Sequence, residues 1–312
     1  MSNSCKIVMY HYVRPLKKSL YPEIKGLELE VFLKQIKYFQ KNFRILTVDQ
    51  IFDSINENRT IPDNSILLTF DDGFKDHYLY VFPFLKEKNI QGLFFPPGKI
   101  IEEDFLLDVH KIHFILASCN NYQKIIQEIF KIIHQNKDEY NLERPESYYA
   151  KLAIPNRFDS KEIIFIKRIL QKGLPRSVRT KFTNYLFERF VKQNQKTFAE
   201  NLYLSLEEIH EMTEGGMYFG SHGYDHEWLT ELSPLELEKE MVKSIKFYSR
   251  LKQSYNEIIF CYPYGDYNTS VITKVKEKKF SIGLTTDLGE AILTESNRFK
   301  LKRYDTNDFP HS

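Results

Sequence analysis

The sequence has little cysteine and no long apolar run. Its three cysteines, Cys5, Cys119 and Cys261, are odd in number and far apart. This pattern predicts thiols in a reducing compartment rather than a disulfide framework. No stretch approaches the roughly 18 apolar residues of a membrane span, and residues 1–12 contain no apolar stretch long enough for a signal peptide. We therefore expect a cytoplasmic protein.

The chain also lacks a strong excess of charge. Its net charge is only +2 over 312 residues, so we expect no nucleic-acid partner. We find no internal repeat and no low-complexity segment. A content of 42% hydrophobic and 28% charged residues is typical of a soluble globular protein. The length suits one large domain, or one domain with a sizeable insertion.

Strands and helices alternate in both outer parts of the chain. Apolar runs predict strands at residues 6–13, 45–48, 66–70, 91–95, 217–220, 258–262, 281–285 and 299–301. Helical spacing and capping signals predict helices at residues 28–43, 49–55, 74–88, 205–214, 234–251 and 271–279. Such alternation predicts an α/β fold with parallel strands, whose sites gather at the carboxyl ends of the strands.

The middle of the chain differs in character. Residues 99–204 lose the strand signals and read as about four helices, which predicts a helical insertion into a domain formed by residues 1–98 and 205–312. Residues 161–192 hold nine Lys or Arg against two Glu. This basic stretch fits a solvated helix face, or a patch that holds a nucleotide or lipid pyrophosphate or an acidic membrane surface.

Two polar clusters suggest a metal site. Asp71, Asp72 and Gly73 end the central strand, and burying both carboxylates without a cation would cost several kcal/mol. A solvated turn is the other interpretation of these residues. His222 and His226 lie four residues apart, a spacing that can place both on one face of a helical turn. Two imidazoles and a carboxylate suit zinc with one position open for water.

This ligand set predicts a metal-assisted hydrolysis of an amide or ester. Zinc lowers the pKa of a coordinated water from near 16 toward about 7. Asp71 stands beside Asp72 and would accept a proton from that water. The reaction also needs N–H donors for a developing oxyanion, and the turn at residues 263–265 could supply one.

Three motifs resemble those of the polysaccharide deacetylases, the NodB-homology carbohydrate esterases. They are Thr69-Phe70-Asp71-Asp72-Gly73, Ser221-His222 with His226, and Tyr262-Pro263-Tyr264-Gly265. The resemblance covers about residues 5–98 and 205–305. It implies an irregular parallel (β/α) barrel with outer helices, and removal of N- or O-acetyl groups from sugars with a divalent metal, commonly zinc.

The resemblance also implies roles for individual residues. Asp71 would be the general base. Asp72, His222 and His226 would bind the metal, and Tyr264 would offer its backbone N–H to the oxyanion.

The chain departs from the family pattern at two places. Cys261 stands where many members have an arginine that tunes the base, and we find no late Leu-x-x-His motif, since the only histidine after His226 is His311. By position, Arg303 could replace the missing charge and His11 could replace the missing acid.

Three further residues are expected to line the substrate site. They are Pro263, Tyr224 and Trp228, and the two aromatic rings flank the second histidine. Aromatic rings in that place suit stacking on a sugar, although ordinary packing beside a metal site explains them equally well.

The leading hypothesis is a cytoplasmic, zinc-dependent N-deacetylase in the assembly of surface glycans. Its substrate would be a nucleotide-linked sugar, a lipid-linked sugar or an oligosaccharide. One alternative is an O-acetyl esterase. The other is a non-catalytic module that binds glycan or lipid and has lost parts of the site.

Overall fold

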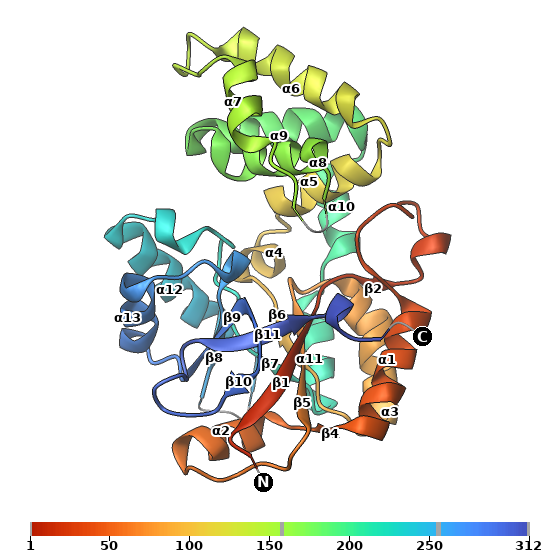
Figure 1. Cartoon of the computed structure of the whole chain (residues 1–312), viewed down its shortest axis with the longest axis vertical. Coiled ribbons are helices and arrows are strands. Elements are labelled where there is room, and N and C mark those ends of the chain that lie inside the picture. The colour runs from red at the N-terminus through yellow and green to blue at the C-terminus, as the bar shows by residue number, and fades with distance from the viewer. Residues whose placement is uncertain (1, 157–158, 254–256, 311–312) are drawn as a thin grey trace. The chain divides into compact units, whose positions relative to one another are not determined.

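The computed structural model describes residues 2–156, 159–253 and 257–310 (Figure 1). Contacts divide the chain into two compact units. The barrel unit contains Met1–Pro15, Gly26–Phe105 and Ala199–Ser312, and the helical unit contains Leu16–Lys25 and Leu106–Phe198. The barrel unit thus extends past the predicted boundary at residue 98 to Phe105 and resumes at Ala199, before the predicted residue 205. No signal in the sequence indicated that residues 16–25 join the helices. None of the described helices is both long enough and apolar enough to cross a membrane.

A curved, mainly parallel sheet forms the barrel unit. Its strands follow the order β7-β6-β5-β1-β11-β9-β8. Their bounds are β1 Ser4–Tyr10, β5 Ser65–Asp71, β6 Leu93–Phe95, β7 Tyr218–Phe219, β8 Ile259–Cys261, β9 Ile282–Leu288 and β11 Leu301–Asp305. Beside this path, β4 Arg44–Ile45 pairs with β5, β10 Ala291–Ile292 pairs antiparallel with β1, and β2 Val13–Arg14 pairs with β3 Leu27–Glu28.

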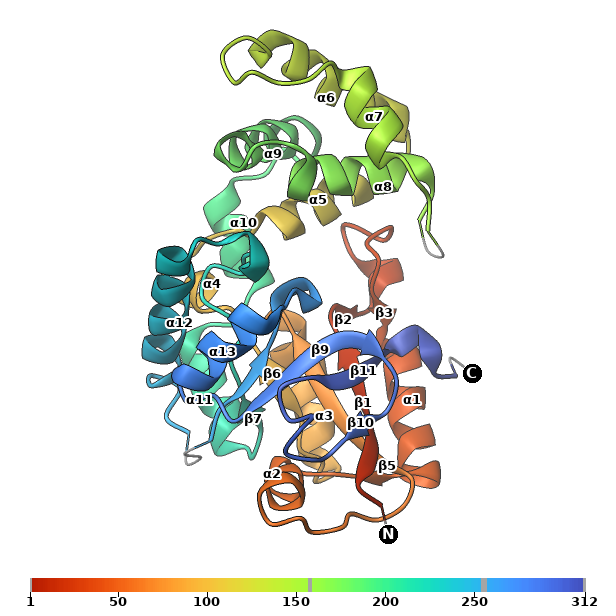
Figure 2. The ribbon, with the colours of Figure 1, turned by 60° about the vertical axis from the view of Figure 1, so that its left-hand side comes forward.

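The two ends of the strand path meet just beyond β7. Ser221 bridges Phe260 of β8. Its N–H donates to the carbonyl of Ile259 at 2.9 Å, and its carbonyl accepts from the N–H of Cys261 at 2.8 Å. These bonds close the sheet into an irregular barrel (Figure 2). The expected α/β barrel is therefore confirmed.

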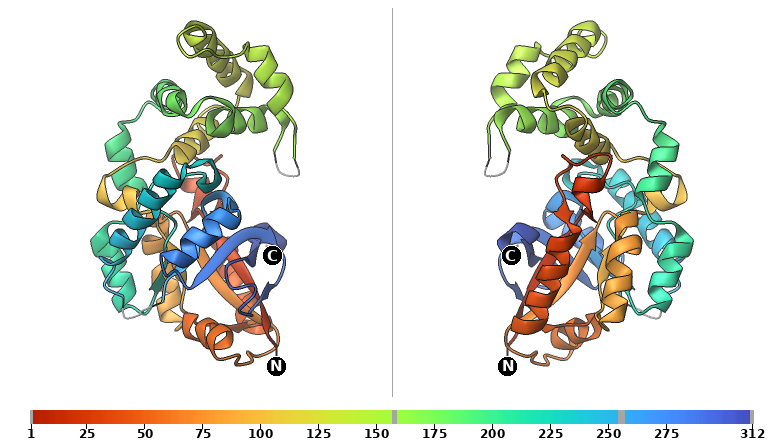
Figure 3. Two further views of the ribbon diagram at one scale, coloured as in Figure 1. Left: turned by 90° about the vertical axis from the view of Figure 1, so that its left-hand side faces the viewer. Right: turned by 90° about the vertical axis from the view of Figure 1, so that its right-hand side faces the viewer.

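Helices cover the outside of the barrel (Figure 3). They are α1 Leu29–Asn42, α2 Val48–Asn56, α3 Phe82–Glu87, α4 Gly98–Glu102, α11 Leu206–Glu214, α12 Pro234–Tyr248 and α13 Thr269–Glu277, with the π-helical turn η2 His77–Val81 and the 3₁₀ turns η4 Leu229–Glu231, η5 Pro263–Gly265 and η6 Thr306–Asp308. The α11 and α12 helices begin at Ser205 and Ser233, whose hydroxyls each accept a backbone N–H in a capping box.

Two local predictions differ from the structure, one in its bounds and one in its winding. The strand predicted at residues 45–48 ends at Ile45, because Thr47 and Gln50 form the capping box that starts α2 at Val48. The helix predicted at residues 74–88 is confirmed over residues 75–87, but it widens into the π-helical turn η2 before α3.

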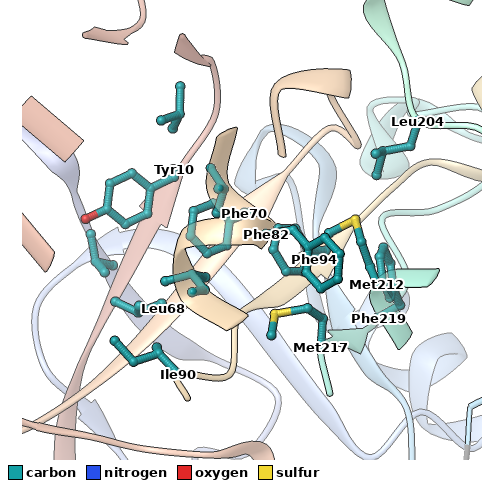
Figure 4. Packing of buried hydrophobic residues seen from close by; sticks show 14 of the residues in the cluster. Tyr10, Leu68, Phe70, Phe82, Ile90, Phe94, Leu204, Met212, Met217 and Phe219 are labelled. Atoms are coloured by element: carbon teal, nitrogen blue, oxygen red, sulfur yellow. The ribbon is translucent and has the colours of Figure 1, made fainter. Parts of the chain in front are cut away.

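Alternation along β5 decides which side chains reach the barrel interior. The strand is buried at every position. Leu68 and Phe70 pack outward among the residues under the covering helices, whereas Leu67 belongs to the interior cluster. The ring of Phe70 stacks between those of Tyr10 and Phe94, with centroids 5.0 and 4.7 Å away (Figure 4). By the two-residue period of a strand, Asp71 faces inward with Leu67.

The helical unit has its own core. Its helices are α5 Asp108–Ala117, α6 Tyr122–Asn136, α7 Pro145–Leu152, α8 Lys161–Arg168 and α9 Arg176–Phe190, with the π-helical turn η3 Ile169–Gly173, the 3₁₀ turn η1 Leu16–Lys18 and the first turn of α10 Gln195–Leu202. These exceed the four helices that the sequence predicted. Buried Asp159 accepts hydrogen bonds from Lys25 and Lys167, which ties residues 16–25 to the helices.

We expect Phe70→Ala to destabilise the protein by about 3–5 kcal/mol, because it leaves a cavity between two stacked rings. Chemical denaturation measures this loss. Leu235→Ala is the matched control, since Leu235 is 64% exposed, and its cost should stay below about 0.5 kcal/mol. Equal costs for the two variants would contradict the packing described for β5.

Candidate active site

The carboxyl end of β5 delivers both carboxylates to one place. Asp71 is the last residue of the strand, and Asp72 follows in a left-handed conformation with φ +70°. The N–H of Asp72 donates to the carbonyl of Phe95 at 3.1 Å, which holds this turn against β6. Gly73 has φ +61°, and a Cβ there would lie 2.7 Å from Pro96. The turn therefore requires glycine and points the Asp72 side chain across the strand ends.

The Asp72 carboxylate meets two imidazoles. Its Oδ1 lies 3.4 Å from Nε2 of His222 and 3.3 Å from Nε2 of His226, and all three side chains are buried. Ligand bonds of about 2.0–2.1 Å in tetrahedral geometry separate neighbouring donor atoms by about 3.3–3.4 Å. The spacing and the chemistry of these donors therefore fit a zinc ion with a fourth position for water.

Hydrogen bonding fixes the orientation of His222. Its Nδ1 lies 2.7 Å from the carbonyl oxygen of Cys261. A carbonyl only accepts, so Nδ1 carries the proton and Nε2 keeps its lone pair for a metal. The helical turn that the spacing of the two histidines allows is not formed, because residues 222–226 form a loop with Gly223 at φ +73° and His226 at φ +54°.

A second group of potential ligands overlaps the first. Asp71, His222 and Cys261 also bring ligand atoms close together. In this group Nδ1 of His222 is already used by a carbonyl, and burial raises the pKa of the Cys261 thiol, which keeps it protonated. The thiol instead lies 3.6 Å from Oδ2 of Asp71 as a weak donor. Asp72 with the two histidines is the better metal site.

Arg303 makes a two-pronged ion pair with Asp71 inside the barrel. Its Nη1 and Nη2 lie 2.9 and 2.8 Å from Oδ1 and Oδ2 of Asp71, and both side chains are buried. Arg303 Nη1 also donates to Thr69 Oγ1 at 3.2 Å, and Nε donates to the carbonyl of Thr285 at 2.8 Å. Burial alone would raise the pKa of Asp71, but the guanidinium of Arg303 lowers it below its ordinary value. Asp71 is therefore ionised at neutral pH.

His11 lies at the rim of the same site. Its Nε2 is 4.0 Å from Oδ2 of Asp71, and its side chain is 42% exposed. Its carbonyl accepts a hydrogen bond from Nε2 of His77 at 2.8 Å. Burial lowers the pKa of His77 to about 4, so that ring is neutral and serves as a fixed donor. The η2 turn thus holds the backbone that carries His11.

The turn after β8 supplies the opposite wall. Pro263 is buried, and Tyr264 adopts φ +59°, which is rare for a residue with a bulky side chain. The Tyr264 ring stacks on Trp228 with centroids 4.1 Å apart and an interplanar angle of 2°. It also makes an edge contact with His226 at 4.7 Å.

Tyr224 does not lie with these rings. Its side chain is buried, and its hydroxyl donates to Glu103 at 2.9 Å. A Cβ at Gly98 would clash with this ring at 2.5 Å, so the ring fills the space beside α4. The expectation that Tyr224 stacks on a substrate is therefore corrected to a packing role.

Sequence reasoning missed the groups that support Arg303. Thr69 could have been found, since it lies two residues before Asp71 on the same face of β5. The carbonyl of Thr285 left no sequence signal, because a backbone acceptor depends only on how β9 and β11 pair.

Comparison with protein families matches the chain to the polysaccharide deacetylases over residues 58–135 and 176–283. The curated relative YxkH of Bacillus subtilis (strain 168), whose name assigns it to the polysaccharide deacetylases, is 30% identical over 96 residues. That match covers 31% of this chain and 34% of YxkH, so the chain matches about a third of the length of the relative. The family resemblance in the three motifs is confirmed.

Solved structures share the fold. The Streptococcus pyogenes deacetylase PplD in complex with acetate aligns with a TM-score of 0.60 at 17% identity, covering 98% of this chain and 93% of PplD. The de-N-acetylase from Aggregatibacter actinomycetemcomitans aligns at 0.56 with 15% identity, covering 96% and 94%. IcaB from Ammonifex degensii aligns at 0.55 with 17% identity, covering 98% and 93%.

We expect Arg303→Met to lower the free energy of unfolding by about 3–5 kcal/mol, because it leaves Asp71 buried without its partner. Adding Asp71→Asn should recover part of this loss, with a coupling of about 1–3 kcal/mol in a double-mutant cycle by urea unfolding.

The pH dependence of that loss has a definite sign. Because Arg303 lowers the pKa of Asp71, the stabilisation is complete above the ordinary carboxylate pKa of about 4. It disappears as the pH falls through the lowered value. The ion pair would be contradicted if the unfolding free energies lost in the two single variants simply added in the double variant. It would also be contradicted if the loss in the Arg303→Met variant grew as the pH fell.

Proposed function

This chain belongs to the polysaccharide deacetylase family, and from that premise we propose that it is a zinc-dependent hydrolase that removes the acetyl group from an N-acetylated sugar. One observation carries the proposal. The Asp72 carboxylate lies at the spacing of neighbouring tetrahedral ligands from two imidazole nitrogens, beside an aspartate that Arg303 keeps ionised. Family membership alone supports deacetylation of a polysaccharide; the metal, the acetylated sugar and the residue roles are our proposal.

Each residue has a defined task in this proposal. A zinc ion held by Asp72, His222 and His226 would supply a water of lowered pKa. Asp71 would serve as the general base beside that ion, because its lowered pKa leaves the carboxylate free of a proton at neutral pH. Arg303 fixes both oxygens of Asp71 and so limits the directions from which a proton can arrive.

Two groups would act on the substrate itself. The backbone N–H of Tyr264 stabilises the developing oxyanion in a site that is mostly buried. His11 donates a proton to the leaving amine, which suits an imidazole 42% exposed at the rim and near Asp71. Pro263 and the stacked pair of Trp228 and Tyr264 offer an apolar wall for a sugar ring.

The charge of the helical unit supports an anionic substrate. Residues 16–25 and 106–198 contain 20 Lys and Arg against 10 Asp and Glu, whereas the remaining residues contain 24 against 32. The formal charges are thus +10 and −8 at pH 7. We propose that the helical unit binds the pyrophosphate of a nucleotide-linked or lipid-linked sugar, in a cytoplasmic step of surface-glycan assembly. Contact with an acidic membrane surface is the alternative role of this charge.

We expect Asp71→Asn to keep zinc and to lose at least about 100-fold in turnover, because it removes a general base. His222→Ala should lose both zinc and turnover. The measurements are acetate release from an N-acetylated oligosaccharide and zinc content after gel filtration. Full turnover by the Asp71→Asn enzyme would refute the base assignment.

The same acetate assay separates the alternatives. An O-acetyl esterase would release acetate from O-acetylated but not from N-acetylated sugars. A non-catalytic module would bind glycan and release none, even with zinc in excess.

We expect Lys172→Glu combined with Arg176→Glu to raise the KM for a nucleoside-diphosphate sugar by about tenfold, because two charge contacts to phosphate reverse sign. The KM for the free sugar should change less than twofold. Arg179 is left intact, since its guanidinium already donates to the carbonyls of Leu174 and Lys172.

Lys41→Glu on α1 of the barrel unit is the control for this pair and should alter neither KM. If the KM rises equally for the two substrates, the basic stretch is only a solvated helix face and does not bind phosphate. Loss of binding to phosphatidylglycerol vesicles, with the KM ratio unchanged, would indicate the membrane role instead.

A further inference from the structure

A buried carboxylate of α12 lies against the loop that carries the second imidazole. Glu240 is 3% exposed, and its Oε1 accepts the backbone N–H of Tyr224 at 2.6 Å and that of Asp225 at 3.0 Å. Its Oε2 also lies 3.1 Å from the N–H of Asp225. One side chain thus satisfies the two N–H groups immediately before His226.

These contacts give two loop N–H groups an acceptor that the local backbone does not supply. Residues 222–226 form a loop without helical hydrogen bonds, and a buried N–H needs a partner. Glu240 is that partner for Tyr224 and Asp225. The absence of a side chain at Gly223 lets the Glu240 carboxylate approach the loop, since a Cβ there would lie 2.7 Å from Oε1 of Glu240.

Neighbouring contacts hold the same loop to the scaffold. The hydroxyl of Ser221 contacts that of Ser244, which lies one turn after Glu240 on α12. The carboxylate of Asp225 pairs with Lys99 at 2.9 Å and with Lys243 at 3.3 Å. The α12 helix therefore presents Glu240 toward the loop backbone, while the lysines hold the outer side chain.

We propose that Glu240 is a positioning residue for the metal site. By fixing the peptide groups of Tyr224 and Asp225, it sets the left-handed backbone of His226 and keeps Nε2 3.3 Å from Asp72. The inference rests on the proposed metal site, and it concerns how tightly and in what geometry this chain holds the ion. Glu240 touches neither the ion nor the substrate.

The test uses graded changes at position 240 in the full-length chain. Glu240→Gln keeps Oε1 as an acceptor, Glu240→Asp withdraws the carboxylate by one methylene, and Glu240→Leu removes it. Glu238→Leu is the matched control, since Glu238 lies on the same helix and, in the described part of the chain, pairs only with Lys274 of α13 and with Lys278, the C-cap of that helix. The readouts are zinc affinity by chelator competition, the visible spectrum of bound Co²⁺, and thermal unfolding of the metal-free protein.

We expect Glu240→Leu and Glu240→Asp to weaken zinc binding by about 10- to 100-fold and to shift the Co²⁺ bands. Glu240→Gln should remain within about threefold of the parent, and Glu238→Leu should match it. If Glu240→Leu does not fold, comparison of the Glu240→Asp and Glu240→Gln variants still tests the positioning role. Unchanged zinc affinity and unchanged Co²⁺ bands in the Asp variant would overturn the proposal, whatever the thermal stability.

His222→Ala separates this result from the fate of the metal site itself. If that variant keeps parental zinc affinity, the proposed ligand set is wrong. If it loses zinc while every Glu240 variant binds normally, the ligand set stands and the positioning role fails.

Discussion

The ion pair between Asp71 and Arg303 is the constraint on which the barrel interior depends. An isolated carboxylate in this interior would take up a proton, and an isolated guanidinium could not be buried at all. Together they keep Asp71 charged beside the imidazoles, with Thr69 and Thr285 completing the hydrogen bonds of Arg303. The strand order β5-β1-β11 brings Arg303 to Asp71. The ion pair in turn links the inward faces of β5 and β11 across β1.

Much of the site could be predicted from the sequence because it depends on local rules. An apolar run that ends in carboxylates places them at a strand end, and the alternation of strands and helices makes those ends coincide. Asp72, His222 and His226 converge for that reason. Arg303 could be suggested only by its position late in the chain, since its pairing depends on which strands become neighbours.

The parts that sequence reasoning missed depend on side chains that act on distant backbone. The spacing of His222 and His226 suits a helical turn, and nothing nearby forbids one. Glu240, sixteen residues after Tyr224, satisfies the loop without helical hydrogen bonds. Tyr224 looked like a stacking ring because it adjoins the histidines, but its side chain is buried and its hydroxyl donates to Glu103. Such pairings are tertiary, so no short sequence window contains them.

The place of β11 in the chain has a consequence for biosynthesis. On the ribosome, β1 and β5 emerge long before Arg303, yet β11 is the strand that lies beside β1 and supplies the guanidinium. Until Arg303 is available, Asp71 must stay hydrated or protonated. The interior of the nascent barrel therefore retains water. Nascent chains that stall before β11 would therefore remain open and be targets for chaperones, however well their earlier helices have formed.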